Sequence, residues 1–275
     1  MTLITQFVLL ASLALSPHGD LHKRIARLTL QIKANPRSPT LHLQRAELHR
    51  LHHDLSASLK DCSQALQLDA SSAPAHLLRA RVLQQLKRFK SARTDLDLFL
   101  KRVPGHVAAR RLSASNHTAL NQHAESVKDW QRVIQETRRP LPSDFIHRAR
   151  ALAHPGLGKI GCALRGLEEG MAKLGPAMSL QLCALDLEEK SGRLKAALIR
   201  LGRVMKNSQR QEGWFLRKAR LLHALGLINA SREAAKSGLD SIEELPLRLR
   251  RKSSTQDLKR QLNTYFGNSE KAGDS

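Results

Sequence analysis

Three histidines stand close together in the stretch HRLHHD, at His49, His52 and His53. Imidazole binds transition metals, and His49 and His53, which are four residues apart, can share one helix face. However, no cysteine stands nearby and no glutamate completes a zinc-protease arrangement. The stretch falls at the end of a helical pattern and in the turn that follows it. We therefore expect a solvated turn and no bound metal.

The chain also lacks the sequence motifs of catalysis. It has no glycine loop of the kind that cradles phosphate, no nucleophile elbow and no supported carboxylate pair. HPGLGKIG, residues 154–161, contains glycine and lysine but lacks the Walker spacing and follows a helical pattern instead of a strand. We predict a turn there, and a protein that is not an enzyme and takes no cofactor.

The three cysteines, Cys62, Cys162 and Cys183, are an odd number without a close-set pair. This spacing argues against a zinc ribbon and against a fold built on disulfides. Each falls within a helical pattern, where a free cysteine packs as a small apolar residue. If the protein is exported, a bridge between Cys162 and Cys183 is the alternative.

The composition favours helices and a polyanionic partner. Aromatic residues make up only 3% of the chain, while Leu, Ala and Arg dominate, and such a mixture favours helix over sheet. The formal net charge of +22 attracts nucleic acid, anionic lipid or polysaccharide, or an acidic protein. The basic residues are spread along the chain, with the densest run at Arg248–Lys252. The alternative is an arginine-rich solvated surface without a dedicated site.

Residues 1–19 carry no charged side chain and contain an apolar run from Phe7 to Leu15. A bilayer span takes roughly 20 apolar residues, so this run suits the central region of a secretory signal instead. Small residues at Ser12 and Ala14 favour cleavage after Ala14. The lack of a preceding Lys or Arg is atypical, and an uncleaved anchor or an ordinary first helix are the alternatives. We predict an exported protein, periplasmic or secreted, with a cytoplasmic location as the alternative.

A period of 34 residues runs through the chain, with one gap of 37 residues before the fourth copy. Six helical segments begin with a large residue, at Leu55, Phe89, His123, Ile160, Leu194 and Ile228. Three positions later stands a small residue, at Ser58, Ala92, Ser126, Ala163, Ala197 and Ser231. The matching upstream helices have Ala46, Ala80, Ala114, Ala149 and Ala219, whereas the fifth copy has Leu185. We expect two helices to approach closely at each pair of small positions.

This pattern resembles the tetratricopeptide repeat, a 34-residue helix–turn–helix unit with small residues at its eighth and twentieth positions. Gly192 and Gly226 fall in the turn between its two helices, and Pro36 and Pro104 fall in its usual proline column. The resemblance implies an all-α, right-handed α-solenoid of about six repeats with a C-terminal capping helix. Each helix pair in such an array buries its apolar face on the next pair. We therefore expect a constraint on side-chain volume at the contacts, with chemistry elsewhere free to vary.

The register divides the chain into five segments. They are a signal peptide (1–19), a lone N-terminal helix (20–36), the repeat array (37–246), a basic linker with the capping helix (247–266) and a disordered tail (267–275). The fourth copy is irregular, because TRRPLPSD adds a residue before it and Pro155, Gly156 and Gly158 mark a longer turn. Loops tolerate such insertions, so we expect the irregularity to lie in turns.

In the tetratricopeptide family, partners usually bind a concave groove formed by the first helices of the repeats. Matching those positions assigns to the groove Arg50, Arg81, Arg111, Arg150, Arg220 and His223, beside the acids Glu47, Asp186 and Glu189. Planar guanidinium groups capture carboxylates or phosphates through paired hydrogen bonds. The alternative is that these arginines pair with nearby acids, as Arg50 can with Glu47, and merely keep the array soluble.

We therefore expect a non-enzymatic adaptor of the cell envelope that binds an acidic or extended protein partner in an arginine-lined groove. The first alternative is a helical-repeat RNA-binding protein, which the charge favours and the scarcity of aromatic residues for base stacking opposes. The second is attachment to anionic lipid or lipopolysaccharide through scattered basic residues. The oligomeric state stays open.

The predicted export can be checked by the intact mass and N-terminal sequence of the native protein from fractionated cells. We expect a mature chain that begins near residue 15 in an exported fraction. An intact Met1 in the soluble cytosol would contradict the signal prediction.

The predicted register can be checked by enlarging a small position. Replacing Ala92 or Ala163 with Leu should overpack a helix crossing and lower the free energy of unfolding by about 1–3 kcal/mol. The measurement is a thermal melt followed by circular dichroism. A melting curve equal to that of the wild type would refute the register.

Overall fold

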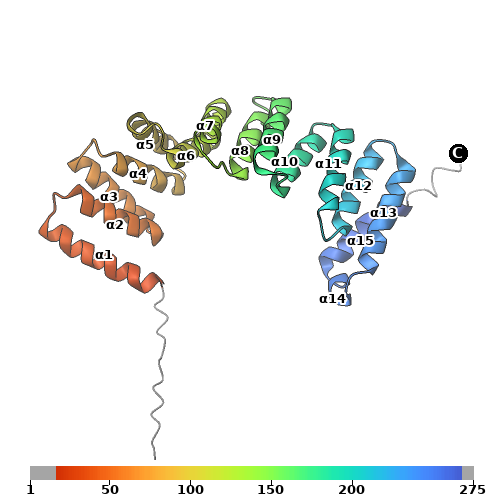
Figure 1. The fold of residues 1–275 in the computed structure, drawn as a ribbon. Coiled ribbons are helices and arrows are strands. Elements are labelled where there is room, and N and C mark those ends of the chain that lie inside the picture. The colour runs from red at the N-terminus through yellow and green to blue at the C-terminus, as the bar shows by residue number, and fades with distance from the viewer. Residues whose placement is uncertain (1–16, 268–275) are drawn as a thin grey trace, which may run out of the picture. The chain divides into compact units, whose positions relative to one another are not determined.

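The structure, a computed structural model, describes residues 17–267, which form fifteen helices and no strand. The chain divides into two compact units, with the boundary between Glu136 and Thr137. In each unit, helices joined by short turns follow one another along the chain (Figure 1). The boundary falls at the linker before the fourth repeat, where the sequence departs from its period.

The N-terminal unit contains one lone helix and three helix pairs. Its helices are α1 (Pro17–Ala34), α2 (Pro39–Leu51), α3 (Leu55–Leu68), α4 (Ala73–Gln85), α5 (Phe89–Arg102), α6 (Val107–Ala119) and α7 (His123–Glu136). The pairs are α2 with α3, α4 with α5, and α6 with α7, and α1 packs against α2.

The C-terminal unit contains three further pairs and a closing helix. Its helices are α8 (Pro142–Ala153), α9 (Ile160–Leu174), α10 (Met178–Lys190), α11 (Leu194–Lys206), α12 (Glu212–Ala224), α13 (Ile228–Glu243), α14 (Leu247–Arg250) and α15 (Ser253–Gly267). The pairs are α8 with α9, α10 with α11, and α12 with α13, and α15 covers both α12 and α13. The predicted all-α fold, with six helix pairs followed by a capping helix, is confirmed.

Both chain ends lie partly outside the described residues. Residues 1–16 of the predicted signal peptide lie outside the described range. Residues 17–19 begin α1, so this helix starts three residues earlier than predicted. The predicted tail lies there after Gly267, the last residue of α15. No helix between residues 17 and 267 combines the length and the apolar character that crossing a membrane requires.

Five helix pairs have small residues at both positions that the sequence period predicts, and the fifth pair along the chain places Leu185 opposite Ala197. The residues at these crossings are almost completely buried on both helices. In three pairs the second helix supplies a serine whose hydroxyl donates to the carbonyl of the first-helix alanine: Ser58 to Ala46 at 2.7 Å, Ser126 to Ala114 at 2.9 Å and Ser231 to Ala219 at 2.8 Å. A larger side chain would separate the helices, so the crossings set the distance between them.

The turns inside five of the described pairs share one left-handed residue. It is His53, Lys87, Asn121, Gly192 and Gly226 in turn, with φ between 57° and 75°. Glycine adopts this conformation without the steric cost that a side chain adds. The fourth pair has a longer turn, residues 154–159, and the predicted insertion there is present.

Ionic groups recur beside the crossings in the first three pairs, where Asp61 and Asp95 are buried and Asp129 is half-buried. Asp61 accepts two hydrogen bonds from Arg45, both at 2.7 Å, and lies 3.4 Å from His42. Thirty-four residues later, Asp95 accepts two 2.7 Å bonds from Arg79 and a contact of 2.7 Å from His76. In the third pair, Asp129 is surrounded by Ser113, Arg110 and His117, at 2.6, 3.3 and 3.2 Å.

The C-terminal unit replaces this aspartate in all three of its pairs, and the sixth pair has Ala234 there. In the fourth, the position is Gly166, and the Arg148 guanidinium fills the space, donating to the Gly166 carbonyl at 3.1 Å and to Glu169 at 2.7 Å. In the fifth, the position is Arg200, a buried cation held by Glu188 and Glu168. The expectation that only volume is constrained is therefore wrong, because a buried charge must keep its partner.

These groups make stability depend on pH. Burial alone would raise the pKa of the Asp129 carboxyl, but His117, Ser113 and Arg110 lower it below its ordinary value. A lowered pKa means that the carboxylate stabilises the fold above the pKa of the unfolded chain, about 3.9. That contribution is lost as the pH falls through the folded-state pKa.

We predict that Asp129→Asn lowers the free energy of unfolding at pH 7 by about 1–3 kcal/mol. The difference from the wild type should shrink as the pH falls below about 4, where the wild-type carboxyl also becomes neutral. Urea titrations at several pH values measure both effects. The matched control is Asp97→Asn, because Asp97 is exposed and lies 3.5 Å from Arg93; a loss as large for the control would refute the role of the buried group.

Candidate binding site

The predicted groove residues of the N-terminal unit lie on the first helices, α2, α4 and α6. Arg50 donates two hydrogen bonds to Glu47, at 2.8 and 2.7 Å. These bonds lower the pKa of the Glu47 carboxyl against the effect of burial, and the charges of Arg50 and Arg81 lower it further. Arg111 is half-buried on α6. The pairing of Arg50 with Glu47, expected as the alternative, is present.

The predicted groove residues of the C-terminal unit make different contacts. Arg150 is exposed on α8 and donates to the thiol of Cys183, whose pKa is nevertheless raised because burial dominates. Arg220 donates to the side-chain carbonyl of Gln261, and the His223 ring lies edge-on to Tyr265 with 5.5 Å between centroids. Gln261 and Tyr265 belong to α15, so the capping helix engages the groove positions of the sixth repeat.

A hollow of about 430 Å³ lies between α1 and α2. We name it the α1–α2 hollow; its lining consists of Arg24, Arg27, Leu28, Gln44, Glu47, Leu48 and Leu51. Leu28 and Leu48 are buried and Leu51 is 46% exposed, so the wall is apolar with polar groups around it. The arrangement combines apolar contact area with a few convergent charged groups, as ligand sites commonly do.

The α1–α2 hollow carries an excess of positive charge. Arg24 and Arg27 are exposed and three residues apart on α1, and neither forms an ion pair or hydrogen bond with another described residue. Glu47 is the single acid in the lining, and Arg50 already satisfies it. Two guanidinium groups are therefore available to an anionic ligand, and each can bind a carboxylate through two hydrogen bonds.

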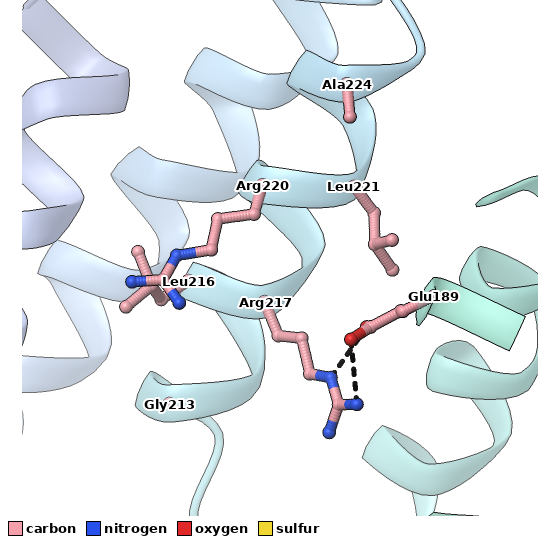
Figure 2. Close-up of a pocket in the computed structure, with 7 residues that line it drawn as sticks. All are labelled: Glu189, Gly213, Leu216, Arg217, Arg220, Leu221 and Ala224. Carbon is pink, nitrogen blue, oxygen red and sulfur yellow. Dashed lines mark hydrogen bonds and ion pairs between the residues drawn. The ribbon is translucent and has the colours of Figure 1, made fainter. Parts of the chain in front are cut away.

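A second hollow, of about 520 Å³, lies between α10 and α12 in the C-terminal unit. Its lining consists of Glu189, Gly213, Leu216, Arg217, Arg220, Leu221 and Ala224. Figure 2 shows Arg217 reaching toward Glu189 while Arg220 points away from it. Arg217 donates to both Glu189 oxygens, at 2.7 and 2.9 Å, and also to Asp186.

The charges of the α10–α12 hollow are compensated within the chain. Burial opposes the charged form of Arg217, but the bonds to Glu189 and Asp186 outweigh it and raise the pKa of the guanidinium. Arg220 donates to the neutral amide of Gln261, and the two acids Glu189 and Asp186 equal the two arginines of the hollow in number. The two hollows thus differ in charge, and the α1–α2 hollow is the better site for an anion.

Sequence reasoning missed Arg24, Arg27 and Arg217. Arg24 and Arg27 lie on the lone N-terminal helix, outside the repeats whose groove positions were matched, although their spacing already placed both on one side of that helix. Arg217 lies next to the groove positions in the repeat register, and its long side chain reaches α10. The sequence feature that could have indicated the contacts of Arg217 is the pair of acids Glu189 and Asp186, which precede it by 28 and 31 residues.

The residues singled out for metal or thiol chemistry are dispersed. His49 lies 3.7 Å from Asp54, and the His52 and His22 rings meet with 3.0 Å between their Nε2 atoms. Within residues 17–267, no group of three or more His, Cys, Asp or Glu side chains is arranged to hold a metal ion. All three cysteines are free, so the alternative bridge between Cys162 and Cys183 is not formed.

No protein-family model matches the chain. Its structure is similar to that of a tetratricopeptide repeat protein from Parabacteroides merdae, with a TM-score of 0.56 and 15% identity over 89% of this chain and 93% of that chain. The C-terminal part of a tetratricopeptide repeat-containing protein from Cytophaga hutchinsonii matches with a TM-score of 0.69, at 11% identity over 87% of this chain and 94% of that one.

A chain from the structure of Naa15/Naa10 bound to HypK is also similar, with a TM-score of 0.58 and 16% identity over 92% of this chain and 40% of that chain. At these identities the comparisons establish the fold. The helices pack in pairs as in tetratricopeptide repeat proteins, so the sequence resemblance to that fold is confirmed in three dimensions.

Proposed function

We propose that this chain is a non-enzymatic adaptor that binds an acidic, extended segment of a partner protein in the α1–α2 hollow. Stacked helical repeats present extended surfaces to partners, and one structurally similar chain comes from the protein complex of Naa15/Naa10 with HypK. Its location in the cell envelope rests on the predicted signal in residues 1–19 and stays a prediction.

The observation that carries the proposal is the pair of uncompensated arginines beside an apolar wall. Carboxylates of the partner would accept paired hydrogen bonds from Arg24 and Arg27. Apolar side chains of the same segment would cover Leu51, which is 46% exposed, and the edges of Leu28 and Leu48. A segment that alternates acidic and apolar residues fits both features. The α10–α12 hollow lacks this excess charge, because Asp186 and Glu189 hold Arg217.

The test uses a fluorescein-labelled peptide of alternating Glu and Leu residues and measures its binding to the full chain by fluorescence anisotropy. We expect Arg24→Glu/Arg27→Glu to weaken binding about ten-fold or more, equivalent to about 1.4 kcal/mol. A peptide with Lys in place of Glu should not bind. Binding of the acidic peptide should weaken with added salt, because part of the attraction acts between exposed charges.

The matched control is Lys23→Glu/Lys33→Glu, which makes the same change of charge on the same exposed helix outside the lining. It should retain most of the affinity. Equal losses in both variants would show attraction by net charge alone and would refute the site. A labelled RNA that loses affinity in the hollow variant, while the peptide does not, would instead favour the nucleic-acid alternative.

A further inference from the structure

Three large apolar residues are exposed on α11 and at the start of α13 in the C-terminal unit. Ile199 on α11 is 63% exposed, and Leu227 and Ile228, at the start of α13, are 50% and 45% exposed. An open hollow of about 530 Å³ lies at the start of α11, where residues 192–196 line it together with Leu225, which follows α12. Leu227 and Ile228 follow within three residues of the lining residue Leu225, and Ile199 is exposed on the helix that begins at the lining residue Leu194.

Basic residues surround these apolar side chains. Lys190, Arg193 and Lys195 are exposed, and their side chains form no ion pair or hydrogen bond with another residue of the described range. We name these three residues, with Ile199, Leu227 and Ile228, the turn patch. Between Lys190 and Gln211 the sequence contains no aspartate or glutamate, so no acid from this segment compensates the patch.

A like-charged neighbour from α9 adds to the positive potential. Arg165 and Arg193 each place a guanidinium nitrogen 3.8 Å from the position that a Cβ at Gly161 would take. Like charges near one another repel, so Arg165 adds to the positive potential around Arg193 and does not relieve it. The acids nearest in sequence, Glu189 and Glu188, are already held by Arg217 and Arg200. The geometry therefore favours an anionic surface as the missing counterpart.

We propose that the turn patch docks on an anionic lipid bilayer, with Ile199, Leu227 and Ile228 entering the headgroup boundary and Lys190, Arg193 and Lys195 contacting lipid phosphates. Amphipathic surfaces bind membranes by this combination of apolar insertion and basic contacts. Nucleic acid is a poorer fit, because the patch offers no aromatic ring for stacking and would leave its apolar residues in water. In this proposal the chain binds at the surface of the bilayer and does not cross it.

The experiment is co-sedimentation of the full chain with phosphatidylcholine vesicles that contain phosphatidylglycerol, compared with pure phosphatidylcholine. We expect binding to the anionic vesicles only. Arg193→Glu/Lys195→Glu should reduce the bound fraction about ten-fold or more, since each basic residue near such a surface contributes about 1 kcal/mol. Ile199→Ser/Leu227→Ser should also reduce the bound fraction. This variant should lose the part of vesicle binding that the wild type retains at high salt.

Matched controls come from exposed residues of the N-terminal unit. Lys60→Glu/Lys90→Glu repeats the charge reversal, and Leu30→Ser/Leu98→Ser repeats the apolar change at side chains that are 66% and 43% exposed. Both should bind vesicles like the wild type. Circular dichroism melts would show that all variants fold, as surface substitutions usually allow.

Three outcomes would overturn the proposal. They are no binding of the wild type to anionic vesicles, equal losses in patch and control variants, or retained binding in both patch variants. A labelled RNA provides the remaining arm: if Arg193→Glu/Lys195→Glu weakens RNA binding while vesicle binding persists, the patch serves nucleic acid. Because Arg24 and Arg27 lie outside the patch, reversing them should leave vesicle binding unchanged, so the two proposals fail independently.

Discussion

The close approach of two helices at a pair of small residues is the constraint on which the remaining structure depends. Where Ala46 meets Ser58, neither side chain is accessible to solvent, and the serine hydroxyl bonds the facing carbonyl. With the helices at this distance, the large residues on either side interlock and each pair presents an apolar face to the next. The same crossing recurs with a period of 34 residues, so one local solution builds both units.

Close packing also explains why charge is buried beside the crossings. Asp61, Asp95 and Asp129 stand at the same register, and each is surrounded by basic or hydroxyl groups from the facing first helix. A buried carboxylate without such partners would be strongly destabilising. When the register position becomes Gly166 or Arg200, the partners change with it, as Arg148 and Glu188 show. The array therefore tolerates either sign of charge but requires compensation.

The surface follows a different rule, because solvent can satisfy an exposed charge. Many basic side chains carry no partner, yet they are not equivalent. Arg24 and Arg27 line the apolar hollow between α1 and α2, whereas Arg193 and Lys195 line an open hollow at a turn together with Leu194 and Leu225. Arg217 is neutralised by two acids from α10. The basic residues behind the net charge of +22 therefore differ in whether acids compensate them and in whether apolar residues surround them.

The sequence by itself determined the all-α architecture, the six helix pairs, the crossings and the irregular turn before α9. It could do so because these features depend on side-chain volume and backbone conformation, which repeat at a fixed spacing. It also indicated that Arg50 could pair with Glu47, since residues three apart on a helix are neighbours.

Only the tertiary structure decided which arginines are compensated. Arg217 is compensated by acids 28 and 31 residues away, whereas Arg220 donates to the neutral amide of Gln261, 41 residues away. The groups around Asp129 likewise come from a facing helix. Electrostatic pairing acts through space between helices, and no spacing within one helix specifies it. The fold was therefore readable from the sequence, while the charge available for binding required the packed helices.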